Sequence, residues 1–206
     1  SFATAIGENA GSYEQGENCI AIGLFAGETN QQKDAIAIAT EEGNNSQGTE
    51  AIAIGYRAGY TGQGETAIAV GYQAGSYNQA INGIAIGYLA GKTGQKSGAI
   101  AIGEQAGETN QGTNSIAIGK LAAPDNQHNN TIVLNATGTA LNTITANSTY
   151  ISPIRNGSGS TVLNYDPTTY ELGYKEANFP IFNNVPLIWD LNNWFSITGV
   201  KIGANA

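Results

Sequence analysis

Residues 51–55 spell Ala-Ile-Ala-Ile-Gly, and this pentapeptide or a close variant recurs along the chain at a constant interval of 16 residues. Numbering its last residue as position 0 places a large aliphatic residue at −1 in every copy and at −3 in all but one, with small residues at −2 and −4. This period of two is typical of a β-strand. The eight copies end at Gly7, Gly23, Ala39, Gly55, Gly71, Gly87, Gly103 and Gly119.

The 16-residue unit predicts the fold class. It is too short for a strand–helix–strand crossover, and glycines at positions 0 and +4 indicate sharp turns. Units of this kind are stable when each stacks on the last, so we expect an all-β fold: a parallel β-solenoid, or β-roll, of eight to nine coils over residues 1–135. Residues 136–149 are predicted to be a transition segment, and residues 150–206 a small β-rich capping region.

The two faces of the repeated strand differ in size, which leads to an expectation about assembly. Fifteen Ile or Val residues lie on one face and small residues, chiefly Ala, on the other. We expect the Ile face to fill the interior of the solenoid and the Ala face to point outward. A smooth Ala surface allows close approach of another sheet, so this interpretation predicts an obligate homo-oligomer packed through Ala.

The most regular polar feature is a column of glutamines at position +8. In a solenoid these side chains would stack, each amide bonding to the next coil and to the backbone. An array of amides facing a ligand is the alternative interpretation. The column consists of Gln15, Gln31, Gln47, Gln63, Gln79, Gln95, Gln111 and Gln127.

Tyr56, Tyr72 and Tyr88 occupy position +1 in three successive coils. Their rings should stack about 4.8 Å apart, which is the spacing of paired strands. Such an aromatic ladder would bind sugar rings as a platform, or would stabilise the edge of the solenoid by contact between its own rings.

Composition argues against several classes of function. The formal net charge is −8, with 8 Lys and Arg against 16 Asp and Glu, so neither a nucleic-acid partner nor insertion into a membrane is expected. The single histidine, His128, and the single cysteine, Cys19, provide little for acid–base or metal chemistry. We therefore predict no catalytic residues, no metal, no cofactor and no enzymatic activity.

Asn114-Ser115-Ile116-Ala117-Ile118-Gly119 resembles the Asn-Ser-Val-Ala-Ile-Gly repeat in the heads of trimeric autotransporter adhesins. The resemblance covers residues 1–135, although the adhesin unit is slightly shorter. It implies a left-handed β-roll with three chains packed about one axis. The longer form of the repeat, Ala-Ile-Ala-Ile-Gly-Tyr-x-Ala-Gly-x-Thr-x-Gln-Gly, is similar to repeats in fibre-like proteins of large DNA viruses and phages. Residues 150–156 and 162–172 are similar to a segment that follows such repeats in viral fibre proteins.

These observations favour a structural and attachment segment of a trimeric surface fibre. The resemblance implies a location on a virion or otherwise outside the cell, and a cell-surface glycan or receptor as a partner besides the other copies of the chain. The alternatives are a bacterial adhesin head, a filament spacer without a ligand, and an ice- or polysaccharide-binding solenoid.

Overall fold

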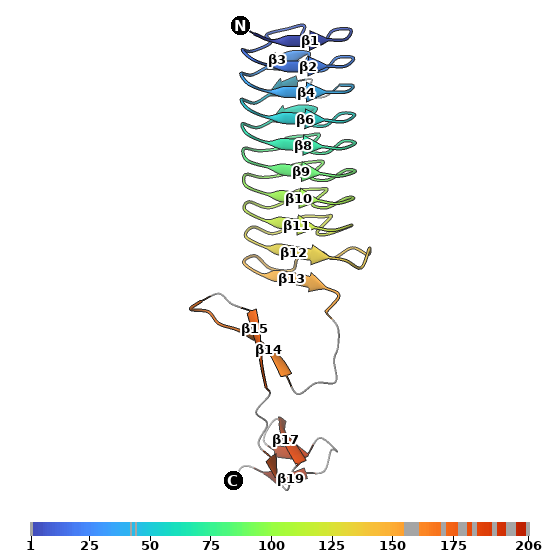
Figure 1. The fold of residues 1–206 in the computed structure, drawn as a ribbon. Helices are drawn as coiled ribbons and strands as arrows, with labels where there is room; N and C mark the ends of the chain where they lie inside the picture. Colours follow the sequence, from blue (N-terminus) through green and yellow to red (C-terminus); the bar gives the residue numbers. More distant parts are fainter. Residues whose placement is uncertain are drawn as a thin grey trace. The chain divides into compact units, whose positions relative to one another are not determined.

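The computed structural model describes residues 2–41, 43, 45–154, 161–169, 172–176, 181–182, 185–190, 193–196 and 201–204. The chain divides into two compact units, Ser1–Ile154 and Arg155–Ala206. Each unit is described separately below, and Figure 1 labels their strands.

The first unit is a stack of similar coils, each of which contributes one strand to a ten-stranded parallel sheet (Figure 1). Neighbouring strands pair residues 16 positions apart, as in Ile84 with Ile100 and Ala85 with Ala101. The structure therefore confirms the parallel β-solenoid and its 16-residue frame. The strands are β1 (Thr4–Ile6), β2 (Ile20–Ile22), β4 (Ile36–Ile38), β6 (Ile52–Ile54), β8 (Ile68–Val70), β9 (Ile84–Ile86), β10 (Ile100–Ile102), β11 (Ile116–Ile118), β12 (Ile132–Asn135) and β13 (Thr149–Ser152).

The opposite wall of the coils is less regular. It includes a three-stranded parallel sheet made of β3 (Thr29–Gln31), β5 (Asn45–Gln47) and β7 (Thr61–Gln63). Further along the stack, single bridges continue the pairing at position +6, from Thr61 through Tyr77 and Thr93 to Thr109. The interior of the solenoid is the narrow space between this wall and the ten-stranded sheet.

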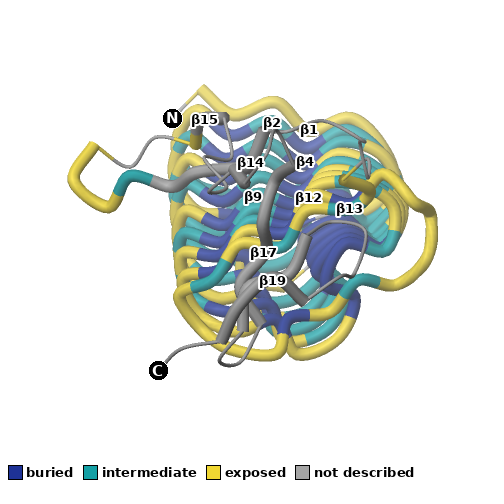
Figure 2. The backbone as a smooth tube through the Cα atoms, turned by 90° about the horizontal axis from the view of Figure 1, so that it is seen from below, coloured by how far each residue is buried: buried dark blue, intermediate teal, exposed yellow. Residues whose placement is uncertain are grey.

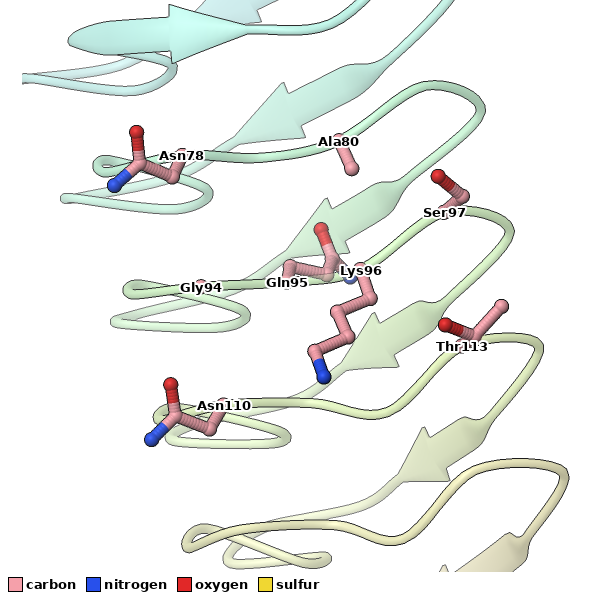
Figure 3. A pocket seen from close by; sticks show the side chains of 8 residues that line it. All are labelled: Asn78, Ala80, Gly94, Gln95, Lys96, Ser97, Asn110 and Thr113. Carbon is pink, nitrogen blue, oxygen red and sulfur yellow. The ribbon is translucent and has the colours of Figure 1, made fainter.

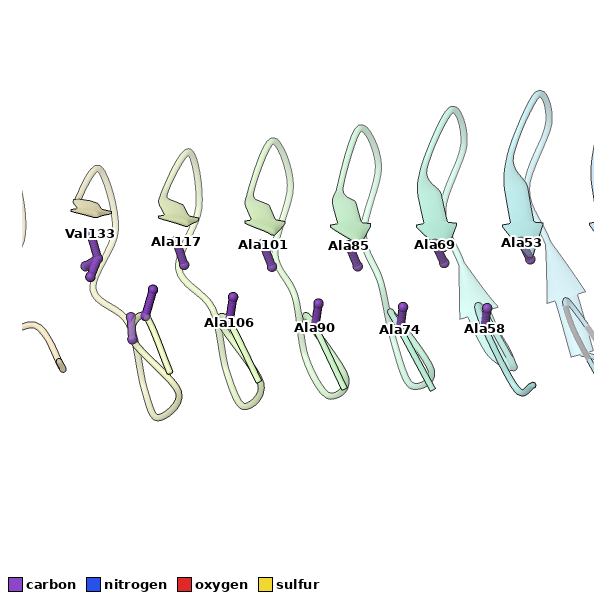
Figure 4. Packing of buried hydrophobic residues seen from close by; sticks show 12 residues of the cluster. Ala53, Ala58, Ala69, Ala74, Ala85, Ala90, Ala101, Ala106, Ala117 and Val133 are labelled. Atoms are coloured by element: carbon purple, nitrogen blue, oxygen red, sulfur yellow. The ribbon is translucent and has the colours of Figure 1, made fainter. Parts of the chain in front are cut away.

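The expected orientation of the repeated strand was wrong: the Ala face points inward and the Ile face outward. Ala85 and Ala101 are fully buried, whereas Ile86 is 39% exposed and Ile102 is 37% exposed. Figure 4 shows Ala residues at position −2 facing Ala residues at position +3 across the interior. The predicted packing of copies through Ala is therefore excluded, because those side chains already form the core.

The width of the coil explains this inversion. Gln95 reaches across the interior from one wall and donates a hydrogen bond from Nε2 to the Ile84 carbonyl oxygen in the other, at 2.8 Å. A gap that one glutamine side chain spans has room for opposed Ala methyl groups but not for two columns of Ile. Alternation in the sequence thus identified the two faces correctly, and the interior volume decided which face is buried.

The turns are made by backbone of left-handed conformation at five positions of each coil: 0, +2, +4, +7 and +11. In the coil that follows β9 these residues are Gly87, Leu89, Gly91, Gly94 and Gly98, with φ of 127°, 56°, 53°, 69° and 66°. At position 0 a side chain would also clash, since a Cβ on Gly87 would lie 2.8 Å from the Gly103 carbonyl oxygen. The sequence pointed to turns only at positions 0 and +4, because the other three columns are filled mostly by residues other than Gly, with Asn the most frequent.

The solenoid continues beyond the predicted boundary at residue 135. β13 pairs with β12 over four residues after a step of 17, as in Ile132 with Thr149, so residues 136–149 close another turn. Larger side chains fill this end: Val133 replaces Ala at −2, and Leu141 and Tyr150 pack against the Ala core. Asn135 takes the Gly column, and its Nδ2 donates to the carbonyl oxygens of Lys120, Leu121 and Thr139, at 2.9, 3.2 and 2.6 Å.

The second unit contains short antiparallel strands. A hairpin pairs β14 (Thr161–Tyr165) with β15 (Leu172–Glu176). The Asp166 carboxylate accepts hydrogen bonds from the backbone N–H groups of Thr168 and Thr169, which lower its pKa. A four-stranded sheet follows, in the order β16 (Ile181–Phe182), β17 (Val185–Asp190), β18 (Asn193–Ser196) and β19 (Lys201–Ala204).

We predict that Ala85→Leu destabilises the solenoid. The larger side chain would have to enter the filled interior, and overpacking of this kind costs about 1–3 kcal/mol or more. Urea or thermal unfolding followed by circular dichroism measures the change. Ala80→Leu is the matched control, because Ala80 is only partly buried, and it should alter stability by less than about 0.5 kcal/mol. Equal stability of both variants would contradict an Ala-filled core.

Candidate functional site

The glutamine column lies inside the solenoid. Gln31, Gln47, Gln79, Gln95 and Gln111 are among the largest fully buried side chains of the described residues. Gln95 shows the recurring pattern: its Nε2 donates to the carbonyl oxygens of Ile84 and Ala99, at 2.8 and 3.2 Å, and to Gln111 Oε1 at 2.9 Å. Gln95 thus joins the two walls of its own coil and links that coil to the next.

The ladder is interrupted at two positions. Gln63 Oε1 and Gln127 Oε1 are buried and have no hydrogen-bond partner among the described residues. Their Nε2 groups still donate across the interior, to the carbonyl oxygens of Ile52 at 2.8 Å and Ile116 at 3.0 Å. The bonds that join the walls are therefore kept where the bond between coils is lost. Because these amides face the interior, the geometry gives a ligand no access to them.

The three tyrosines at position +1 form a stack on the outer surface. The ring centroids of Tyr56 and Tyr72 are 5.3 Å apart, as are those of Tyr72 and Tyr88, with interplanar angles of 24° and 17°. The exposed fraction rises along the stack, from 36% at Tyr56 to 51% at Tyr88. Tyr72 has a ring against each face, so it presents mainly its edge and hydroxyl group to solvent.

Arg57 closes one end of this stack. Its guanidinium carbon lies 5.2 Å from the Tyr56 ring centroid and 5.1 Å from that of Tyr60. Arg57 Nε also donates to Glu41 Oε2 at 2.6 Å, and this bond is the main reason why the arginine pKa is raised. At the other end, the column continues beyond Tyr88 with Glu104, which pairs with Lys120 of the following coil, so the aromatic stack ends at Tyr88.

Sequence reasoning missed the Arg57–Glu41 pair, although the frame contains the signal. Both residues occupy position +2 in successive coils. The same spacing joins Lys92 with Glu108, at 3.9 Å, and Lys120 with Glu104, at 3.0 Å. Opposite charges 16 residues apart thus identify ion pairs between neighbouring coils.

No protein-family model, no curated protein and no solved structure matches this chain.

The two residues with reactive side chains lie in structural positions. His128 Nδ1 is 2.8 Å from Thr143 Oγ1, in the turn between the last two coils. The Cys19 thiol is buried at position −4, donates to the Gln32 carbonyl oxygen at 2.7 Å, and has its pKa raised by that burial. In the described part of the chain, no group of three or more His, Cys, Asp or Glu residues is arranged to hold a metal ion.

An extended apolar surface is the outer face of the ten-stranded sheet, here called the Ile stripe. It consists of the residues at −3 and −1, which are half-buried or exposed along the whole sheet, and Figure 2 shows the burial of the coils from below. The described residues include no helix long and apolar enough to cross a membrane. The members of the stripe that are more than a third exposed include Ile6, Ile54, Ile86, Ile102, Ile118, Ile132, Leu134 and Ile151.

We predict that Gln95→Leu destabilises the solenoid by about 2–4 kcal/mol, because it leaves several buried polar groups without partners. It removes the three bonds that Gln95 donates and the acceptor for Gln79 Nε2. Urea unfolding measures the loss.

Gln73→Leu is the matched control for this change. Gln73 lies at position +2 with φ of 52°, and Leu89 and Leu121 already occupy that column at 56° and 54°. This variant should keep its stability within about 0.5 kcal/mol. A stability loss that is the same for both variants would show that the buried ladder does not support the fold.

Proposed function

We propose that this chain is the structural and attachment segment of a homotrimeric surface fibre, carried on a virion and used to contact a host surface. In this proposal the solenoid is a stiff rod and not an enzyme. The observation that carries the proposal is the Ile stripe, a continuous apolar face left on the outside of a solenoid whose interior is already filled.

Second copies of the same chain are the occupants that fit the Ile stripe best. Monomeric proteins rarely expose apolar patches larger than a few hundred Å², and this one follows all ten strands of the sheet. Its side chains repeat with every coil, so parallel copies would match coil for coil about a common axis. Cyclic symmetry of this kind gives a closed assembly. The resemblance to adhesin heads supports three copies and a left-handed winding.

Burial of the Ile stripe also solves a problem of stability. The core of each coil contains mainly Ala methyl groups and glutamine amides, which bury little apolar area per residue. Each further Ile removed from water contributes up to about 1.5–3 kcal/mol, in proportion to the area that it still exposes in the single chain. Assembly through the stripe therefore supplies the large aliphatic core that the single chain lacks.

Attachment in this proposal uses the tyrosine stack of Tyr56, Tyr72 and Tyr88. A sugar ring can pack against the exposed part of the Tyr88 ring, while the hydroxyl edges of the stack offer hydrogen bonds. A single contact of this kind is weak, about 0.5–1.5 kcal/mol by analogy with aromatic pairs. Three stacks on one trimer would bind a glycan-coated surface together, and the gain would come from avidity.

The oligomeric state tests the proposal directly. Multi-angle light scattering should give three times the mass of one chain, and replacing Ile86 and Ile102 together by Asp should yield monomers or aggregates. The aspartates would bring six like charges into one interface. Ile81→Asp is the matched control, because Ile81 is 48% exposed at position +10, away from the stripe, and it should leave the trimer intact. A folded wild-type monomer at micromolar concentration would refute the proposal.

Binding is tested by replacing Tyr56, Tyr72 and Tyr88 together with Ser. We expect the variant to remain a trimer and to lose binding on a glycan array or to host cells, by about tenfold or more per trimer. Tyr13→Ser is the control, since Tyr13 is 64% exposed but lies outside the stack. If the triple variant loses thermal stability while its binding persists, the stack is structural only and the fibre attaches through other residues.

A further inference from the structure

A polar trough runs along the wall opposite the Ile stripe. Two adjoining hollows of about 400 and 420 Å³ form it, and they share Lys96 and Asn110. The trough lies on the outer side of the wall that carries the glutamines, because Gln95 points from this wall into the interior. It is therefore separate from both the Ile stripe and the tyrosine stack.

Small residues on the neighbouring coils create the trough. Position +9 carries Lys96, and in the coils on either side the same position is Ala80 or Gly112. Figure 3 shows Lys96 extending along the floor toward the coil that carries Asn110 and Thr113. The Lys96 side chain is thus bordered by space instead of by its column neighbours.

Hydrogen-bonding groups line both sides of this floor. Asn78 and Asn110 point the same way from coils on either side of Gly94, and the hydroxyl groups of Ser97 and Thr113 lie on the other side (Figure 3). In the second hollow, Asn110 Nδ2 donates to Asn126 Oδ1 at 3.1 Å. The trough therefore offers amides, hydroxyl groups and one ammonium group.

Lys96 is the lysine that has no acidic partner. Of the four lysines whose side chains the structure describes, Lys33, Lys92 and Lys120 each pair with a carboxylate within 4 Å, and Lys96 does not. Neither Asp nor Glu lines either hollow. Although the chain has a net charge of −8, the ammonium group of Lys96 can therefore pair with the carboxylate of a ligand without competition from an Asp or Glu of the trough.

Backbone N–H groups along the floor of the trough already have partners, which argues against a peptide strand as the ligand. The N–H groups of Gly94, Lys96 and Asn110 donate to carbonyl oxygens of adjacent coils, at 2.9, 3.1 and 2.8 Å. A peptide that binds by extending a sheet needs an unpaired edge, and this wall does not present one there. A ligand with its own hydroxyl groups and a carboxylate matches the side chains that remain.

We propose that the trough binds an acidic oligosaccharide, with a uronate carboxylate on Lys96 and the sugar hydroxyl groups on Asn78, Asn110, Ser97 and Thr113. The coils repeat at about the strand spacing of 4.8 Å, so a glycan strand that lies along the stack would place one sugar beside Lys96 and its neighbours beside the amides and hydroxyl groups of the adjoining coils. The site is complete within one chain and does not depend on the oligomeric state or on the tyrosine stack.

Isothermal titration of the whole chain with tetragalacturonate, and in parallel with neutral cellotetraose, tests this site. We expect the acidic sugar to bind and the neutral one to bind at least about tenfold more weakly, because a charge-assisted hydrogen bond is lost. Lys96→Gln should weaken tetragalacturonate binding by about the same factor. Ala80→Gln should block the trough without a change of charge, and position +9 already accepts glutamine at Gln32.

Lys120→Gln is the matched control, since it removes one positive charge at position +1, outside the trough, and should leave the affinity unchanged. An equal loss in Lys120→Gln would show general charge attraction and overturn the site. The proposal is also overturned if wild type binds neither sugar, if cellotetraose binds as tightly as the acid, or if a tetraglutamate peptide competes equally well. Circular dichroism of each variant verifies that the solenoid is folded.

Discussion

The width of the interior is the constraint on which the rest of this structure depends. The two walls of each coil are separated by the length of one glutamine side chain, and that side chain fixes the distance by bonding to the opposite backbone. In the eight repeats only Ala, Ser, Cys or Gly lies beside it at −4 and −2, and the Ile and Val side chains at −3 and −1 are directed outward. Thr131 and Val133 take the two inner positions only in the coil of β12. The core and the outer apolar surface are therefore two results of the same narrow gap.

The sequence was sufficient to predict the coil length, the strand pairing and the columns of equivalent residues, because a strict repeat shows directly which residues occupy the same position in successive coils. It was not sufficient for the direction of the strand face. Hydrophobicity ranks Ile above Ala for burial, and that ranking holds only where the interior has room for Ile. The invariant glutamine was the available signal, since seven buried amides must find acceptors on a facing backbone, and only small neighbours let them reach it.

The candidate sites were predictable to different degrees. The tyrosine stack followed from the repeat alone, because equal columns must lie one above another. The cover that Arg57 gives to Tyr56 depends on side-chain direction, which the repeat does not specify. The trough was harder still to predict from the sequence, because it results from the small residues Ala80 and Gly112 on either side of Lys96. Small residues do not stand out in a Gly-rich chain.

The direction of the hydrogen bonds between coils has a mechanical consequence. These bonds run from one coil to the next, parallel to the stacking direction, so a pull along that direction is carried by every junction in series, and the stack is only as strong as its weakest junction. A single solenoid pulled in this way would lose its coils one after another, as successive junctions break. Copies joined along the Ile stripe would bridge many junctions at once, and the same pull would then have to shear several apolar contacts together. A thin coil thus gains tensile strength from its outer surface, even though its core contains little beyond Ala and Gln.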